Sequence, residues 1–377
     1  MMMRDEVLSN ALNRIHPGWL HYAQIVLLAL PMLTLYLPGH YGSFFVFPAL
    51  ILVAYRRKEL GISKEFIWLY LLFIAYLLLF SLVSMNHRLS FKGSYDMIRG
   101  TWFFFIGLLF ARLVQNYKEY AVLPIATLPL LFGMFLFPQE HHYGYHVNPN
   151  NNAVLTAAYF VFLLPFVDEK KWNWLMLTSL VGLSCALYLL LLENSRGAWL
   201  GLAVACILMI WLQRRWPLLL KLMLTLMPIA ALLLVYYWFN YKGFGDSLRF
   251  EIWSALLRYT FDNSFLLGFG INSAKEIMVQ QHLYVLTTHN LVLDLFVSSG
   301  VIGMAMFMLW LLLMVRHYWS RDYRRHTFFY VSIFGMTAFL VMAMFDLKFA
   351  SLNFMATMSL FAGFLYSQRI PPLDKSQ

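Results

Sequence analysis

The chain has 377 residues, of which 61% are apolar and 12% are charged, and its formal net charge is +10. A soluble domain has about 25% charged and about 45–50% apolar residues, and no soluble fold of this length has enough interior for so apolar a chain. The composition therefore excludes a soluble fold, a disordered chain, a disulfide scaffold and conventional nucleic-acid binding. It predicts an all-α, polytopic transmembrane protein.

Apolar runs of the length of membrane helices recur along the chain and predict about twelve spans. Two runs, 43–55 and 153–167, are short for a full crossing, and tilt or fusion with a neighbour would accommodate them. The expected spans are 21–37, 43–55, 66–84, 96–114, 120–138, 153–167, 174–192, 197–212, 217–239, 290–315, 327–345 and 349–367.

The basic residues between these runs predict the orientation, because cytoplasmic loops carry an excess of Lys and Arg. With the N-terminus in the cytoplasm, 19 of the 28 Lys and Arg residues lie inside and nine lie outside. We therefore expect both termini in the cytoplasm. The basic clusters are interpreted as anchors at the inner leaflet, without a chemical role.

Arg88 and Lys92 precede the fourth expected span on the outer side. We interpret them as interface anchors or as additional contacts for a phosphate group.

The next outer loop, 139–152, contains three histidines whose spacing superficially suggests a metal site: His141, His142 and His146. The only carboxylate nearby is Glu140, so we expect no metal there.

Residues 193–202, with the sequence ENSRGAWLGL, place Arg196 at the junction of two apolar runs. A charge at such a depth costs about 2.5–3.5 kcal/mol even on the insertion scale, so it faces a cavity or a partner. Arg196 would form a structural pair with Glu193, three residues earlier, or an anion site beside the outer leaflet. Gly197 and Gly201 would let a neighbouring helix or a ligand approach closely.

Residues 240–289 form a long outer loop, and loops of this length are usually functional. Within it, residues 247–260 have apolar side chains at helical spacing, which predicts an amphipathic helix at the outer interface. These apolar residues are Phe250, Trp253, Leu256 and Leu257.

Arg249 lies on this amphipathic helix and faces lipid headgroups or binds phosphate, because a guanidinium grips phosphate oxygens in pairs. Farther along the loop, residues 273–283 begin with Ser273 and Glu276 at the spacing of a capping box. This spacing predicts a second helix.

His289 lies where the long loop enters the tenth expected span, in the sequence TTHNLVLDLFVSSGVIG. Thr287 or Thr288 can cap that helix. An imidazole in the first turn feels the positive end of the helix dipole, which favours the neutral form that a general base requires. The alternatives are a polar boundary residue and a general base with Asp294 as its partner.

The chain contains no P-loop, no dinucleotide-binding glycine motif and no paired-carboxylate cluster. Nucleotide-driven transport and metal-dependent transfer from nucleotide sugars therefore lack support. The candidate chemistry consists of arginines and one histidine on the outer side, and we expect no cofactor.

These motifs resemble those of the O-antigen ligase and polymerase superfamily of bacterial envelope proteins. His289-Asn290 followed after nine residues by Gly300-Val-Ile-Gly303 reproduces the signature of that family. Further elements that resemble the family are Ser195-Arg196-Gly197, Arg249 with Trp253 before Gly268-Phe-Gly270, and the Asn-Pro-Asn turn at 148–150. The resemblance covers about residues 140–310.

The resemblance implies a GT-C-type glycosyltransferase of the bacterial inner membrane, with residues 1–377 as one integral membrane domain and 240–289 as its periplasmic loop. Such enzymes use an undecaprenyl-diphosphate-linked glycan as donor, without a metal. In the ligase branch the polysaccharide passes to a sugar of the lipid A core at the periplasmic face. A single displacement would invert the configuration at the anomeric carbon of the transferred sugar.

Under this resemblance, His289 would orient or deprotonate the acceptor hydroxyl, and Arg196 and Arg249 would neutralise the departing diphosphate. Asn290, Arg88 and Lys92 would add substrate contacts. An O-antigen polymerase and a protein O-oligosaccharyltransferase share the donor and stay as alternatives. A transporter of lipid-linked sugars is a more distant one, because it would carry polar residues near the midplane and show repeat symmetry.

Overall fold

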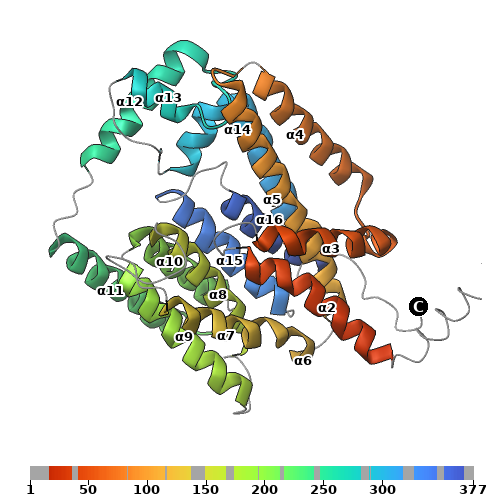
Figure 1. Cartoon of the computed structure of the whole chain (residues 1–377). Coiled ribbons are helices and arrows are strands. Elements are labelled where there is room, and N and C mark those ends of the chain that lie inside the picture. Colours follow the sequence, from red (N-terminus) through yellow and green to blue (C-terminus); the bar gives the residue numbers. More distant parts are fainter. Residues whose placement is uncertain are drawn as a thin grey trace, which may run out of the picture.

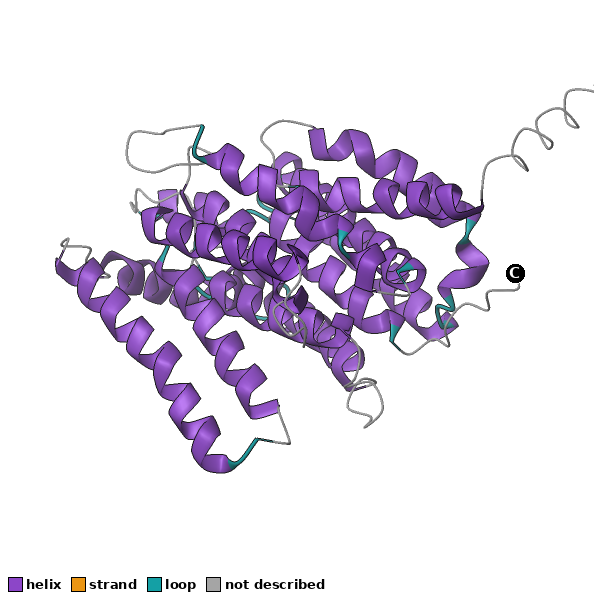
Figure 2. Ribbon diagram, turned by 90° about the horizontal axis from the view of Figure 1, so that it is seen from below, coloured by secondary structure: helices purple, strands orange, loops and turns teal. Residues whose placement is uncertain are grey.

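The chain is described here from a computed structural model that covers residues 17–35, 41–82, 84–114, 117–136, 149–166, 174–193, 195–212, 216–241, 247–281, 288, 290–316, 327–345 and 352–368. Every regular element within these ranges is a helix, so the prediction of an all-α protein is confirmed (Figure 1; Figure 2).

The helices follow one another in chain order with short connections between most of them. Their bounds are α2 Pro17–Thr34, α3 Tyr41–Tyr55, η1 Arg57–Leu60, α4 Lys64–Leu82, α5 His87–Leu113, α6 Tyr117–Tyr120, α7 Val122–Met134, α8 Pro149–Leu163, η2 Leu164–Phe166, α9 Trp174–Glu193, α10 Arg196–Leu212, α11 Leu218–Tyr241, α12 Ser247–Ser264, α13 Ala274–Gln280, α14 Leu291–Arg316, α15 Thr327–Ala343 and α16 Leu352–Ser367.

Fewer helices are long enough to cross a membrane than the twelve spans expected. Within the described ranges three qualify by length and apolar composition: α4, α9 and the segment Leu291–Leu309 of α14. Eight further apolar stretches of 10–17 described residues lie within the other helices.

Close helix packing in the centre of the molecule depends on glycine. A Cβ atom on Gly107 of α5 would lie 2.6 Å from the carbonyl oxygen of Leu360 on α16, and one on Gly363 of α16 would lie 2.2 Å from that of Phe104 on α5. The two backbones are therefore in direct contact, as small residues permit in membrane helices. Figure 1 shows α5 and α16 side by side in the middle of the molecule.

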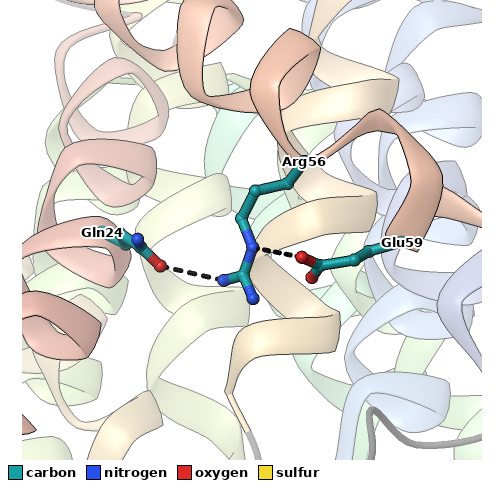
Figure 3. Close-up of polar contacts among 3 residues, drawn as sticks. All are labelled: Gln24, Arg56 and Glu59. Atoms are coloured by element: carbon teal, nitrogen blue, oxygen red, sulfur yellow. Dashed lines mark hydrogen bonds and ion pairs between the residues drawn. The ribbon is translucent and has the colours of Figure 1, made fainter. Parts of the chain in front are cut away.

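At the end of α3, Arg56 ties two early helices together (Figure 3). Its Nε donates a hydrogen bond to Oε1 of Glu59 at 2.7 Å, and its Nη1 donates one to Oε1 of Gln24 on α2 at 2.8 Å. Its neighbours Arg57 and Lys58 are exposed. One member of a cluster that the sequence assigns to membrane anchoring thus has a structural role between helices.

The two helices expected within the 240–289 loop are present as α12 and α13. Figure 1 shows them together at one end of the molecule, beside one end of α4, α5 and α14. This end is called the α12 end below. α12 buries Ile252 and Leu256 against α13 and α14, whereas Phe250 and Leu257 of the expected apolar face are exposed, so its amphipathic position at the outer interface stays a prediction.

The capping box expected at the start of α13 is wrong. The hydroxyl of Ser273 donates to the carbonyl oxygen of Gly270 at 2.6 Å and does not cap the helix. Glu276 instead accepts a hydrogen bond from the side-chain amide of Asn86, which precedes α5. Both side chains therefore connect α13 to its surroundings and not to its own first turn.

Helix α14 is interrupted at Gly300, whose φ of 61° and ψ of −166° are non-helical. A Cβ atom here would lie 2.3 Å from the carbonyl oxygen of Leu266, so the position requires glycine for both its backbone angles and its close contact. The segment that follows α12 occupies the interruption. It forms four backbone hydrogen bonds with α14: Phe269 N to Val297 O, Gly270 N to Ser298 O, Val301 N to Phe265 O, and Ile302 N to Leu266 O.

The second glycine of the signature, Gly303, makes room for α4. The hydroxyl of Tyr76 on α4 donates to the carbonyl oxygen of Ser299 at 2.8 Å, next to the interruption. A Cβ atom on Gly303 would lie 2.8 Å from that hydroxyl and 2.3 Å from the Ser299 side chain. The two glycines of the G-x-x-G element thus join α14 to α12 on one side and to α4 on the other.

Candidate functional site

Arg196 is the first residue of α10 and is half-buried. The buried Ser195 precedes it and caps the helix, because its hydroxyl oxygen accepts a hydrogen bond from the backbone N–H of Ala198 at 3.3 Å. A serine directly before an arginine therefore has a local structural purpose: it begins the helix so that the guanidinium emerges from the first turn.

Glu193 makes its hydrogen bond with another helix and not with Arg196. Only 1% of this residue is exposed, and its Oε1 accepts a hydrogen bond from the hydroxyl of Thr156 on α8 at 2.8 Å. The bond joins the end of α9 to α8. The interpretation of Glu193 as the structural partner of Arg196 gains no support from this geometry.

Helix α10 packs against α15 through Gly201, five residues after Arg196. A Cβ atom on Gly201 would lie against the carbonyl oxygen of Ala338 and 2.8 Å from the Met342 side chain. This part of α10 thus contacts α15 near the last turns of α15. Gly201 therefore lets a helix approach closely, as the sequence indicated.

Arg249 on α12 reaches the same end of α15. Its Nη1 donates a hydrogen bond to the carbonyl oxygen of Phe345 at 3.2 Å, just beyond the last helical residue, Ala343. The last carbonyls of a helix have no partner within the helix and carry its negative dipole end, so they attract a guanidinium. Arg249 thus lies at the end of α15, the helix that α10 contacts through Gly201.

Trp253 lies one turn after Arg249 and holds the segment before α14. Its indole Nε1 donates a hydrogen bond to the carbonyl oxygen of Thr288 at 2.8 Å. Thr288 is 2% exposed. The sequence marked Trp253 as part of an apolar face, and its role as a hydrogen-bond donor depends on a partner 35 residues away that no local pattern could indicate.

Asn290 caps α14. Its Oδ1 accepts a hydrogen bond from the backbone N–H of Leu293 at 3.0 Å, so the expectation that Thr287 or Thr288 caps this helix is wrong. Thr288 contributes less directly, because its hydroxyl oxygen accepts a hydrogen bond from the N–H of Asn290 at 3.5 Å. Part of the Asn290 side chain is therefore engaged in the fold, and its contact with substrate stays a prediction.

His289, the expected general base, lies outside the described residues, as do His141, His142 and His146. Its neighbours in the chain, Thr288 and Asn290, are described, and Asp294 follows in the first turn of α14 with 4% exposure. The catalytic role of His289 stays a prediction.

Arg88 and Lys92 are exposed in the first turns of α5. Their neighbours Leu89 and Ser90 contact the segment before α13, because Leu89 O and Ser90 Oγ accept hydrogen bonds from Asn272 Nδ2 and Ile271 N. Figure 1 shows α4 and α5 beside α14, with α9, α10 and α11 grouped on the other side. Arg88 and Lys92 therefore lie at the α12 end of the molecule, close to the segment that precedes α13.

An apolar cavity of about 450 Å³ lies between α12, α14 and the end of α15. It begins at the polar contacts just described, since Trp253 and Asn290 both belong to its wall. The wall is otherwise apolar, and its remaining residues are Leu257, Phe261, Phe265, Val292, Leu293, Phe296, Val301, Met304 and Met344.

Residues 181–308 match the family model described as O-antigen ligase. The matched segment is about a third of the chain and includes Arg196, Arg249, His289 and Asn290, whereas Arg88 and Lys92 precede it. No curated protein gives a significant match. Over this segment the chain is similar to the O-antigen ligase family, and its apolar helices indicate an integral membrane protein.

Proposed function

We propose that the protein is an O-antigen ligase, a GT-C-type glycosyltransferase that moves an O-polysaccharide from undecaprenyl diphosphate to a sugar of the lipid A core. The observation that carries this proposal is the arrangement of α12. Its Arg249 reaches the end of α15, the helix that packs against α10, and its Trp253 donates a hydrogen bond to the residue before His289. An apolar cavity adjoins both contacts.

The arginines suit a diphosphate leaving group. Cleavage of the bond to the anomeric carbon leaves negative charge on the diphosphate, and fixed guanidinium groups stabilise that charge in the transition state. Arg196 emerges from the start of a helix, where the dipole also favours an anion. Arg249 would approach the diphosphate from α12, at the end of α15. The pair would bind the phosphate oxygens, with Arg88 and Lys92 as more distant contacts.

His289 is assigned to the acceptor. A neutral imidazole there would accept the proton of the acceptor hydroxyl as its oxygen attacks the anomeric carbon, and the diphosphate would leave from the opposite face with inversion. The cap at Asn290 and the bond from Trp253 to Thr288 hold the residues on either side of it.

The apolar cavity is assigned to the first isoprene units of the donor. Its wall consists of leucine, phenylalanine, valine and methionine side chains from α12, α14 and the residue after α15. A hydrocarbon chain buried there gains about 25 cal/mol per Å² of apolar surface removed from water. The polar end of the cavity, at Trp253 and Asn290, would then face the diphosphate.

The proposed setting is the bacterial inner membrane, with both termini in the cytoplasm and the α12 end facing the periplasm. The charge distribution supports this orientation, because most Lys and Arg residues fall on the opposite side. Fusion of a periplasm-active reporter after residue 377 tests it, since cytoplasmic termini predict an inactive reporter.

Two experiments test the proposed activity. Purified protein in detergent, incubated with lipid-linked O-polysaccharide and core lipopolysaccharide, should give glycosylated core, and absence of product with a donor of proven activity would contradict the proposal. A deletion strain should accumulate core-only lipopolysaccharide and polymer on the prenyl carrier. Cores with a single repeat would instead identify a polymerase, and loss of protein glycosylation an O-oligosaccharyltransferase.

A further inference from the structure

Helix α12 has a polar face that the proposed chemistry leaves unused. A groove of about 450 Å³ runs along this face and ends against Gln281 after α13. We call it the polar groove. Its lining residues are Glu251, Ser254, Ala255, Arg258, Tyr259, Asp262, Asn263 and Gln281.

The polar groove is separate from the apolar cavity, although both lie along α12. At 100° per residue, the charged groove residues lie within about 20° of Glu251, the buried residues Ile252 and Leu256 about 100–140° from it, and the cavity residues Leu257 and Phe261 about 240–280° from it. α12 therefore lies between an apolar space on one side and a polar one on the next. Such a helix is suited to a ligand with an apolar part and a polar part.

The charged groups of the groove are available to a ligand. The side chains of Glu251, Arg258 and Asp262 are all exposed. Among the residues that the structure describes, Arg258 forms no ion pair within 4.0 Å with either carboxylate. The hydroxyl of Tyr259 donates to Gln280 at 3.0 Å, which fixes its ring at the wall of the groove.

The arrangement of charges decides between classes of ligand. The two carboxylates are 11 residues apart on α12, about 16 Å along its axis, so they cannot hold one metal ion together. With two carboxylates and one guanidinium, the groove also disfavours a phosphate. Donors and acceptors instead alternate along it: Glu251, Ser254, Arg258, Asp262 and Asn263. A row of hydroxyl groups, each a donor and an acceptor, matches this pattern.

We propose that the polar groove binds carbohydrate and thereby positions a glycan of the transfer reaction. Its volume falls in the range of about 300–1,000 Å³ that small-molecule sites occupy. Fork-shaped Arg258 and the carboxylate of Asp262 would bind neighbouring hydroxyls in pairs. The proposal rests on the proposed function for the origin of the sugar, which is the donor polysaccharide or the acceptor core.

Steady-state kinetics of Arg258→Gln and Asp262→Asn test the groove, with Lys275→Gln, an exposed residue of α13 outside it, as the matched control. Loss of a charged hydrogen bond predicts a rise in KM of about tenfold for one substrate, with kcat within about twofold. A rise in the KM of the donor identifies the polysaccharide, and a rise in that of the acceptor identifies the core. Unchanged KM for both, or an equal change in the control, would overturn the proposal.

A binding measurement separates this proposal from the transferase assignment. Saturation-transfer NMR uses the wild type and Arg258→Gln in detergent, with O-polysaccharide and core oligosaccharide released by mild acid as probes. Transfer of saturation to sugar protons that weakens in the variant supports the groove even if wild-type protein transfers no glycan. No saturation transfer with either probe overturns the groove even if the protein is an active ligase.

Discussion

The indole of Trp253 and the carbonyl of Thr288 are joined by a 2.8 Å hydrogen bond that connects α12 to the entrance of α14. Replacing Trp253 by Phe removes this donor and keeps an aromatic ring in the wall of the cavity. We expect transfer to fall about fivefold to tenfold, because one lost hydrogen bond costs about 1 kcal/mol and displaces the residue before His289. Trp174→Phe, at an exposed tryptophan of α9, is the control. Equal activity of the two variants would show that the bond does not position the site.

Arg196 and Arg249 should depend on their fork-shaped head groups and not on charge alone. Arg196→Ala and Arg249→Ala should abolish transfer while the protein inserts at normal levels, and the Lys variants should recover little, because ammonium cannot bind two phosphate oxygens in the same geometry. Immunoblots and an in vitro ligation assay measure both properties. Arg57→Ala, an exposed arginine after α3, should behave as wild type. Degraded protein in the Arg196 variants would indicate a structural role instead.

Glu193 should be replaceable by glutamine. Its Oε1 accepts the Thr156 hydrogen bond, and a glutamine amide oxygen can do the same. We expect Glu193→Gln to retain transfer and thermal stability in detergent, and Glu193→Ala to lose about 1–3 kcal/mol because Thr156 is left without its buried partner. If Glu193→Gln folds normally but transfers no glycan, the activity depends on the negative charge of Glu193, three residues before Arg196.

Gly300→Ala should destabilise the protein more than an alanine at another glycine with positive φ. Gly61 has φ of 58° and is exposed, so alanine there costs only the backbone term of about 1–3 kcal/mol. At Gly300 the same substitution also places a Cβ atom against the backbone of Leu266, at a further cost of about 1–3 kcal/mol. Thermal unfolding of both variants measures the difference. Equal unfolding midpoints would mean that the backbone at Leu266 moves away from the new Cβ atom without loss of stability.

The apolar cavity can be tested through the length of the prenyl chain. Leu257 lines the cavity, and Leu257→Gln should raise the KM for undecaprenyl-linked donor more than for a donor on a short prenyl chain. Leu226→Gln, an exposed leucine on α11, should change neither constant. An equal rise in KM for both donors would show that the prenyl chain binds outside this cavity.

The helical class and the two helices in the long loop are predictable from the sequence, because they follow from apolar length and helical periodicity. The sequence does not predict which hydrogen-bond partner a side chain binds when several partners are possible. Ser273 and Glu276 fit a capping box, yet both bind groups outside α13. Asn290 caps α14 in place of a threonine, because it directly precedes Leu291, the first residue of the helix.

The number of spans was also not predictable from apolar runs alone. Hydropathy reports how apolar a stretch is but not where its helix ends. Pro48 in α3 and Pro129 in α7 lie in helices of 15 and 13 residues, which are shorter than a membrane crossing. The contact from Tyr76 to Ser299 depends in the same way on tertiary structure, because it uses a carbonyl next to the interruption of α14.

The attachments at the two sides of α12 are formed by different parts of the chain: backbone groups of the segment that follows α12 on one side, and the Arg249 side chain on the other. On the α14 side four backbone hydrogen bonds follow from the interruption at Gly300. On the α15 side the described hydrogen bond of Arg249 with Phe345 uses a side chain. A single substitution at Arg249 can therefore remove this hydrogen bond, whereas the backbone bonds with α14 tolerate changes in the side chains of the residues that form them.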